Sequence, residues 1–112
     1  MSAPVLERPT EESVLFALDA LGNSPVKVAA SLIEKGITGN RHSAGSCPIA
    51  EYLKAQFPGV SVSTYYSSAI YEIGDNGLLD DRKEIVNVEN PDPVVRFIRE
   101  FDNGGYPTLA AL

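Results

Sequence analysis

The residues best suited to chemistry in this 112-residue chain lie together in one glycine-rich segment, residues 36–50. The segment holds the single histidine of the chain, His42, its single cysteine, Cys47, and Arg41. Cys47 precedes Pro48 at an expected helix start, where the positive end of the helix dipole stabilises a thiolate and free backbone N–H groups can bind an anion. The segment therefore raises two hypotheses, a reactive thiol at Cys47 and an anion-binding loop.

Each of these hypotheses has a simpler alternative. Cysteine is a small and mostly buried residue, so Cys47 can serve as an inert residue at the start of the helix. His42 lies in the same loop without an evident third partner, whereas cysteine hydrolases need a positioned base and an orienting group. The glycine spacing matches neither the phosphate-binding P-loop nor the dinucleotide pattern, and Pro48 lacks an N–H donor. One histidine and one cysteine do not make a tetrahedral metal site, so neither a metal nor a cofactor is expected.

Three tyrosines form a second candidate site. Tyr65, Tyr66 and Tyr71 lie in residues 60–71, a stretch without any charged residue. We expect strands over residues 60–66 and 69–73, in which neighbouring Tyr65 and Tyr66 point to opposite faces of the sheet. Exposed tyrosines on an uncharged strand are typical of protein interfaces, and such a strand also offers an edge for pairing with another chain. The alternative is that both strands are simply buried.

Composition and charge restrict the classes of function. The chain is 44% hydrophobic, enough for one globular domain over residues 10–112, preceded by a tail over residues 1–9. Its net charge is −6, with six acids and five bases in residues 1–59 and nine acids and four bases in residues 60–112. No Lys/Arg cluster is available for a phosphate backbone. The lone cysteine, the N-terminus without signal-peptide character and the lack of a long apolar run indicate a cytoplasmic protein that does not span a membrane.

The elements that must position these residues are helices first and strands afterwards. Capping signals at Thr10, Ser24-Pro25 and Cys47-Pro48 predict three helices, of which the first two are expected to form a hairpin. The buried stripe of the second helix is expected to be Val26, Ala29, Ala30 and Ile33.

Three strands are expected to follow as an antiparallel meander, the third over residues 84–88. The turn residues at 75–82 predict a hairpin loop, because the spacing and closing glutamate of a calcium loop are missing. Asp92, with Pro93 at the first helical position, is expected to cap a last helix. The predicted fold class is α+β, with an N-terminal helical hairpin and third helix, a three-stranded antiparallel meander and a C-terminal helix.

This order of elements also permits a winged-helix-like DNA-binding protein. Residues 26–37 and 47–57 would form its helix-turn-helix pair. The link between them is about ten residues long, however, where three or four are usual. The would-be recognition helix offers one lysine and a glutamate, and acids stand at the hairpin tip where a wing needs bases. Binding to nucleic acid is therefore the less favoured alternative.

Two short motifs suggest a family. Cys47-Pro-Ile-Ala-Glu-Tyr-Leu, preceded by Gly-Ile-Thr-Gly, and Phe101-Asp-Asn-Gly-Gly-Tyr-Pro-Thr-Leu together resemble a CP[ILV]AxYL helix start and an FDxGxYPxL ending. The pair is similar to small uncharacterised proteins of actinobacteria and their phages, over most of the chain from Thr10 onward. This resemblance implies a bacterial or phage cytoplasmic setting and no particular activity, cofactor or catalytic residue.

The sequence as a whole predicts a non-enzymatic regulatory or protein-interaction domain, because no convergent set of catalytic groups is evident. The expected partner is another protein or a second copy of the chain, as a homodimer. Tyr65, Tyr66 and Tyr71 are the expected contact residues, with Arg41 and His42 as a second contact surface on the loop. A thiol-dependent redox or anion-binding protein acting through Cys47 is a further alternative.

Overall fold

The computed structural model describes residues 9–72 and 83–111 of the chain. Within them, four α-helices and three strands follow in the order α1 (Glu11–Asp19), α2 (Pro25–Glu34), α3 (Pro48–Gln56), β1 (Val60–Thr64), β2 (Ser67–Glu72), β3 (Lys83–Glu89) and α4 (Asp92–Asp102). The strands form an antiparallel sheet in the order β1-β2-β3, so the predicted α+β fold is confirmed. The predicted tail, except Pro9, and the predicted hairpin loop at 75–82 lie outside the described residues.

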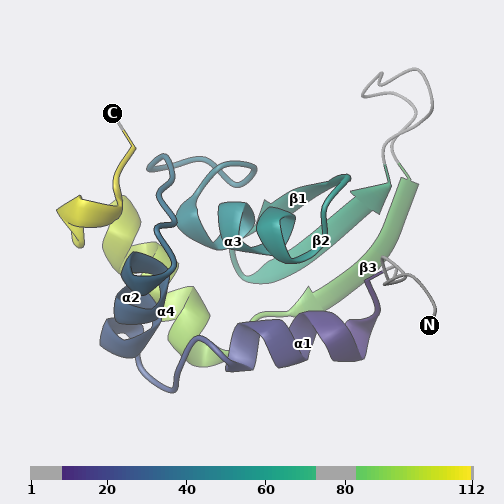
Figure 1. The fold of residues 1–112 in the computed structure, drawn as a ribbon, viewed down its shortest axis with the longest axis horizontal. Helices are drawn as coiled ribbons and strands as arrows, with labels where there is room; N and C mark the ends of the chain where they lie inside the picture. Colours follow the sequence, from purple (N-terminus) through teal and green to yellow (C-terminus); the bar gives the residue numbers. More distant parts are fainter. Residues whose placement is uncertain (1–8, 73–82, 112) are drawn as a thin grey trace, which may run out of the picture.

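The helices lie beside a single layer of sheet (Figure 1). Helix α1 packs against β3, and α3 packs against β1. Helices α1 and α2 follow each other through a short link, but the main helical partner of α2 is α4. In the part of the chain that the structure describes, none of the helices has the length and apolar character needed to cross a bilayer.

Local side-chain signals start the first two helices as expected. The Thr10 hydroxyl accepts a hydrogen bond from the Ser13 amide at 3.1 Å, and the Ser13 hydroxyl accepts one from the Thr10 amide at 2.8 Å. This reciprocal capping box satisfies two N–H groups that the helix itself cannot. Ser24 caps α2 through a 3.2 Å bond from the Lys27 amide, with Pro25 at the first helical position.

The start of α4 differs by one residue from the prediction. Pro91 is the N-cap, and Asp92 and Pro93 are the first two helical residues. The Pro91 carbonyl already accepts hydrogen bonds from the amides of Val94 and Val95, at 2.9 and 3.2 Å. Both positions after the cap tolerate proline because their N–H groups have no partner inside a helix.

The buried side of α2 also differs from the prediction. Pro25, Val28, Ala29 and Leu32 face the core, whereas Val26 is 68% exposed and Ile33 is 48% exposed. Apolar residues occupy both sides of this short helix, so its hydrophobic periodicity does not determine its rotation. The rotation follows from packing against α4.

The sheet has one covered face and one open face. Successive strand residues alternate between the two faces, and the register pairs Val62 with Ile70 and Ile70 with Val86 on the covered face. These three residues belong to the core, together with the largest fully buried side chains Phe97, Phe101, Leu18, Leu21, Leu32, Ile49 and Leu53. On the open face, Ser63 pairs with Ala69, and Ala69 pairs with Asn87.

Tyr65 and Tyr66 lie in the turn between β1 and β2, not in a strand as predicted. The strand ends at Thr64, and the Tyr65 amide donates to the Ser67 carbonyl at 3.0 Å across the turn. The expected alternation of the two rings across the sheet is therefore wrong. Their ring centroids lie 4.6 Å apart, so the tyrosines contact each other at the end of the hairpin.

A closed ring of three buried polar side chains fixes this turn. Asn90 Nδ2 donates to Thr64 Oγ1 at 2.9 Å, Ser68 Oγ donates to Asn90 Oδ1 at 2.6 Å, and the two hydroxyl oxygens lie 2.7 Å apart. With these donors assigned, the remaining proton is donated by Thr64 to Ser68, so the ring is closed. Asn90 also holds the turn itself. Its side-chain Nδ2 donates to the Tyr65 carbonyl at 2.7 Å, and its backbone N–H donates to the Tyr66 carbonyl at 2.9 Å.

We predict that Asn90→Ala lowers the free energy of unfolding by about 2–3 kcal/mol, because it leaves the buried hydroxyls of Thr64 and Ser68 without their partner. Asn23→Ala is the matched control, since Asn23 lies exposed in the link between α1 and α2 and should change stability by no more than about 0.5 kcal/mol. Urea unfolding followed by circular dichroism measures both. Equal effects of the two substitutions would contradict a structural role for the ring.

Candidate functional site

The glycine-rich loop is bound along its length to the C-terminal part of the chain. The Gly39 amide donates to the Leu109 carbonyl at 2.9 Å, and the Ala111 amide donates to the Gly39 carbonyl at 2.7 Å. A Cβ atom on Gly39 would lie 2.4 Å from the Pro48 nitrogen and 2.6 Å from the Ser46 oxygen. Glycine is needed here because its backbone lies against the backbone of Ser46–Pro48, where a side chain has no room. This packing explains the glycine without a bound phosphate.

Arg41 closes the end of α4. Its guanidinium donates to the carbonyl of Phe101 and, at 2.8 Å, to that of Gly105. The same group lies 4.5 Å from the centre of the Phe101 ring, a cation–π geometry. A cation at a helix C-terminus also compensates the negative end of the dipole. The structure therefore gives this half-buried arginine a set of internal partners.

His42 lies at the rim of the loop with its side chain exposed and a positive φ of 56°. Its backbone amide donates to Asp102 Oδ1 at 2.8 Å, which joins the loop to the last residue of α4. The two residues are 60 positions apart in the sequence. Nothing in the local pattern around His42 indicated this partner.

Cys47 is buried, with 1% of its surface exposed. Burial raises the pKa of its thiol; the amides of Ala50 and Ile49 oppose this shift, and the charges of Asp102 and Glu51 add to it. The raised pKa disfavours the thiolate, which is the reactive form. The surroundings of Cys47 are thus the opposite of those that the thiol hypothesis requires.

Five of the loop amides that an anion could use already have internal partners. Internal carbonyl or carboxylate oxygens accept hydrogen bonds from the amides of Gly39, Asn40, His42, Ser46 and Cys47. With these five donors engaged, the loop ahead of α3 has fewer N–H groups to offer a phosphate. These contacts argue against the anion-binding hypothesis.

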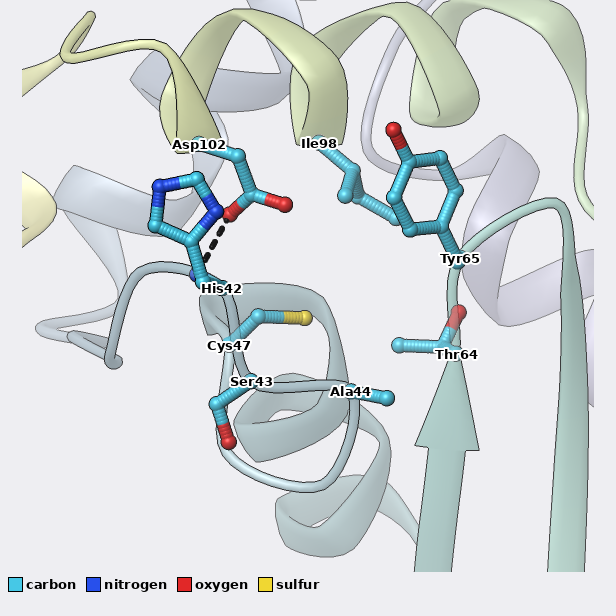
Figure 2. A pocket seen from close by; sticks show the side chains of 8 residues that line it. All are labelled: His42, Ser43, Ala44, Cys47, Thr64, Tyr65, Ile98 and Asp102. Carbon is cyan, nitrogen blue, oxygen red and sulfur yellow. Dashed lines mark hydrogen bonds between the residues drawn. The ribbon is translucent and has the colours of Figure 1, made fainter.

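Tyr65 lines two hollows of the described structure. The first, which we call the loop pocket, has a volume of about 300 Å³ and lies between the loop, the hairpin turn and α4 (Figure 2). Its lining combines apolar, aromatic and acidic groups: His42, Ser43, Ala44, Cys47, Thr64, Tyr65, Ile98 and Asp102.

The second, which we call the sheet hollow, has a volume of about 320 Å³ and lies on the open face of the sheet. Its lining contains no charged residue: Ala44, Ser63, Thr64, Tyr65, Tyr66, Ser67, Ala69, Tyr71 and Asn87. All three tyrosines singled out in the sequence meet here. Ala44, Thr64 and Tyr65 border both hollows.

Sequence reasoning found only part of these linings. It identified the tyrosines, His42 and Cys47, but it missed Asp102 and Asn87, which come from α4 and β3. Neither residue carries a sequence signal, because its place beside the loop or the hairpin depends on how the elements pack.

The would-be recognition helix of a DNA-binding protein has few groups free for phosphate. The Lys54 ammonium lies 3.2 Å from the Glu51 carboxylate and donates to the Gly45 carbonyl at 3.0 Å. The apolar side of α3 is buried, including Ile49, Tyr52 and Leu53.

Comparison with protein-family models, with curated proteins and with solved structures gave no match.

We predict that Gly39→Ala destabilises the protein by about 1–3 kcal/mol, because the added Cβ must displace the backbone at Ser46–Pro48. Gly45→Ala in the same loop is the control: its Cβ would meet only the Val62 oxygen, at an ordinary 3.5 Å. Thermal unfolding of both variants tests this. A stable Gly39→Ala variant would show that the contact with the backbone of Ser46–Pro48 is not tight.

We predict that Cys47 does not react with Ellman's reagent in the folded protein, because the thiol is buried and protonated. The same protein unfolded in urea should react completely, which provides the control. Native-state reaction at the rate of a free thiol would restore the thiol hypothesis.

Proposed function

We propose that this chain is a non-enzymatic protein-interaction domain that associates with a second copy of itself. The contact surface is the open face of the β1–β2 hairpin, centred on Tyr66 and the sheet hollow. The observation that carries the proposal is an exposed aromatic side chain, 65% accessible, beside an uncharged hollow on the same face. We place the domain in the cytoplasm, a setting in which cysteines remain reduced.

Charge favours this face as the contact between copies. The chain carries a net charge of −6, so two copies repel each other over most of their surfaces. Residues 60–71 contain no charged residue. Bringing two such faces together avoids both like-charge repulsion and the cost of removing charges from water.

The shape of the face suits a two-fold arrangement. A dimer with two-fold symmetry uses the same patch on both copies, so the patch must be complementary to itself. Here Tyr66 protrudes at the hairpin end, and the adjacent hollow is lined by Ser63, Ala69 and Tyr71. We propose that Tyr66 of each copy fills the sheet hollow of the other. Tyrosine is among the residues that most often dominate interface energies.

Contact through the face is favoured over pairing at the strand edge. The Thr64 amide, at the outer edge of β1, donates to the Ala44 carbonyl of the loop at 3.0 Å. Helix α3 also packs against β1. A new strand added along this edge would have to displace the loop, whereas the open face needs no rearrangement.

The contacts of the loop support a non-enzymatic role. The thiol of Cys47 is buried, and Arg41 is engaged with the end of α4. A nucleophile and a base would need to lie within hydrogen-bonding reach of each other. Among the described residues, no hydrogen bond joins Cys47 to His42.

We predict that the protein elutes with about twice its 12.0 kDa mass in size-exclusion chromatography with light scattering, with and without reducing agent. Tyr66→Glu should weaken dimerisation at least roughly thirtyfold, the effect of losing a dominant interface residue and burying a charge. Phe16→Glu is the matched control, since Phe16 on α1 is another exposed aromatic residue, 78% accessible.

A monomer at every concentration, or equal weakening by Tyr66→Glu and Phe16→Glu, would overturn the proposal. Folding of each variant is checked by circular dichroism, so that a loss of dimer is not confused with unfolding.

A further inference from the structure

We propose that the loop pocket binds a primary alkylammonium group, of the kind carried by a lysine side chain or a free alkylamine. This inference goes beyond self-association, because the pocket differs from the sheet hollow in most of its lining residues and needs no second copy to be complete.

The acidic end of the pocket is Asp102, the last residue of α4. Its Oδ1 atom accepts the His42 amide at 2.8 Å, which holds the carboxylate in place. Figure 2 shows the other carboxylate oxygen directed into the pocket, on the side that faces Tyr65. Within the described residues no hydrogen bond reaches that oxygen, and the negative end of the helix dipole lies at the same place. An ammonium group here gains a hydrogen bond and a charge partner.

The body of the pocket is apolar. Ala44 and Ile98 line it, and Figure 2 shows the Cys47 sulfur and the Thr64 methyl directed toward its interior. A four-carbon alkyl stem can lie along these groups while its charged end remains near solvent, as lysine side chains do. The Tyr65 ring forms the wall, where an ammonium group also gains cation–π attraction.

The charges around the pocket favour a cation over an anion. The Arg41 guanidinium is committed to the carbonyls of Phe101 and Gly105, and no ion pair among the described residues joins it to Asp102. The negative charge of Asp102 is also felt inside the pocket, since after burial it contributes to the raised pKa of Cys47.

The test is a titration followed by two-dimensional amide NMR, with n-butylammonium chloride as the first probe and n-butanol at equal concentration as its neutral counterpart. Sodium chloride corrects for ionic strength. We expect n-butylammonium to shift the amides of His42, Ala44 and Tyr65, and n-butanol to shift them markedly less. Nα-acetyl-lysine N-methylamide is the second probe. Binding as tight as that of n-butylammonium assigns the pocket to a lysine side chain, and weaker binding assigns it to a free amine.

Two variants locate the site. Asp102→Asn keeps an oxygen to accept the His42 amide but removes the charge, and should weaken n-butylammonium binding by about threefold to fivefold, as for a partly exposed ion pair. Asp92→Asn, at the other end of α4, removes the same charge and should have no effect. Ala44→Leu fills the pocket from an exposed position and should abolish the shifts.

Equal shifts with n-butanol, or binding unaffected by Asp102→Asn, would overturn the inference. Repeating the titration on Tyr66→Glu separates it from the proposed function: the monomeric variant should bind the amine as tightly as the parent protein. A protein that dimerises but binds no amine refutes the inference alone.

Discussion

The hairpin turn, the end of β3 and the start of α4 meet at one buried hydrogen-bonded ring, and the loop pocket and the sheet hollow both border it. Thr64, Ser68 and Asn90 satisfy one another completely, so the ring adds no unpaired polar group to the core. Through Asn90 the same ring bonds the carbonyls of Tyr65 and Tyr66. It therefore fixes the backbone that carries the two aromatic rings. Without the ring of hydrogen bonds, the backbone at Tyr65, which lines both hollows, and at the exposed Tyr66 would not be held in one position.

The loop that looked most suited to chemistry is held by a second set of constraints. Gly39 approaches the backbone ahead of α3, Arg41 caps α4, and the His42 amide binds Asp102. Glycine, arginine and backbone amides often occur in catalytic or anion-binding sites. They do so because they supply conformational freedom, a fixed positive charge and a hydrogen-bond donor, respectively. The same properties serve here to join two chain segments. What remains for a ligand is the space enclosed by the joined segments, the loop pocket.

The two hollows differ in the partner that they suit, although they share a wall. On the open face of the sheet, the uncharged lining of the sheet hollow and the exposed ring of Tyr66 suit a second copy of the chain, because they bring no like charges together. In the loop pocket, a carboxylate at a helix C-terminus beside apolar side chains suits a small cation. The difference arises from which elements contribute: strands of neutral residues on one side, the end of α4 on the other.

The sequence by itself determined the local parts of this protein. Caps at Thr10 and Ser24, and the order of helices and strands, follow from hydrogen bonds and periodicity within a few residues, so they were predictable. The rotation of α2 was not, because Val26 and Leu32 offer apolar surface on two sides of one helix and only packing against α4 chooses between them. The tyrosine turn was missed because β-forming residues continue through it, and the side chain that holds its carbonyls is Asn90, distant in the sequence. The loop pocket, likewise, was decided only by tertiary structure, because the carboxylate that gives it a charge lies 60 residues beyond the histidine it contacts.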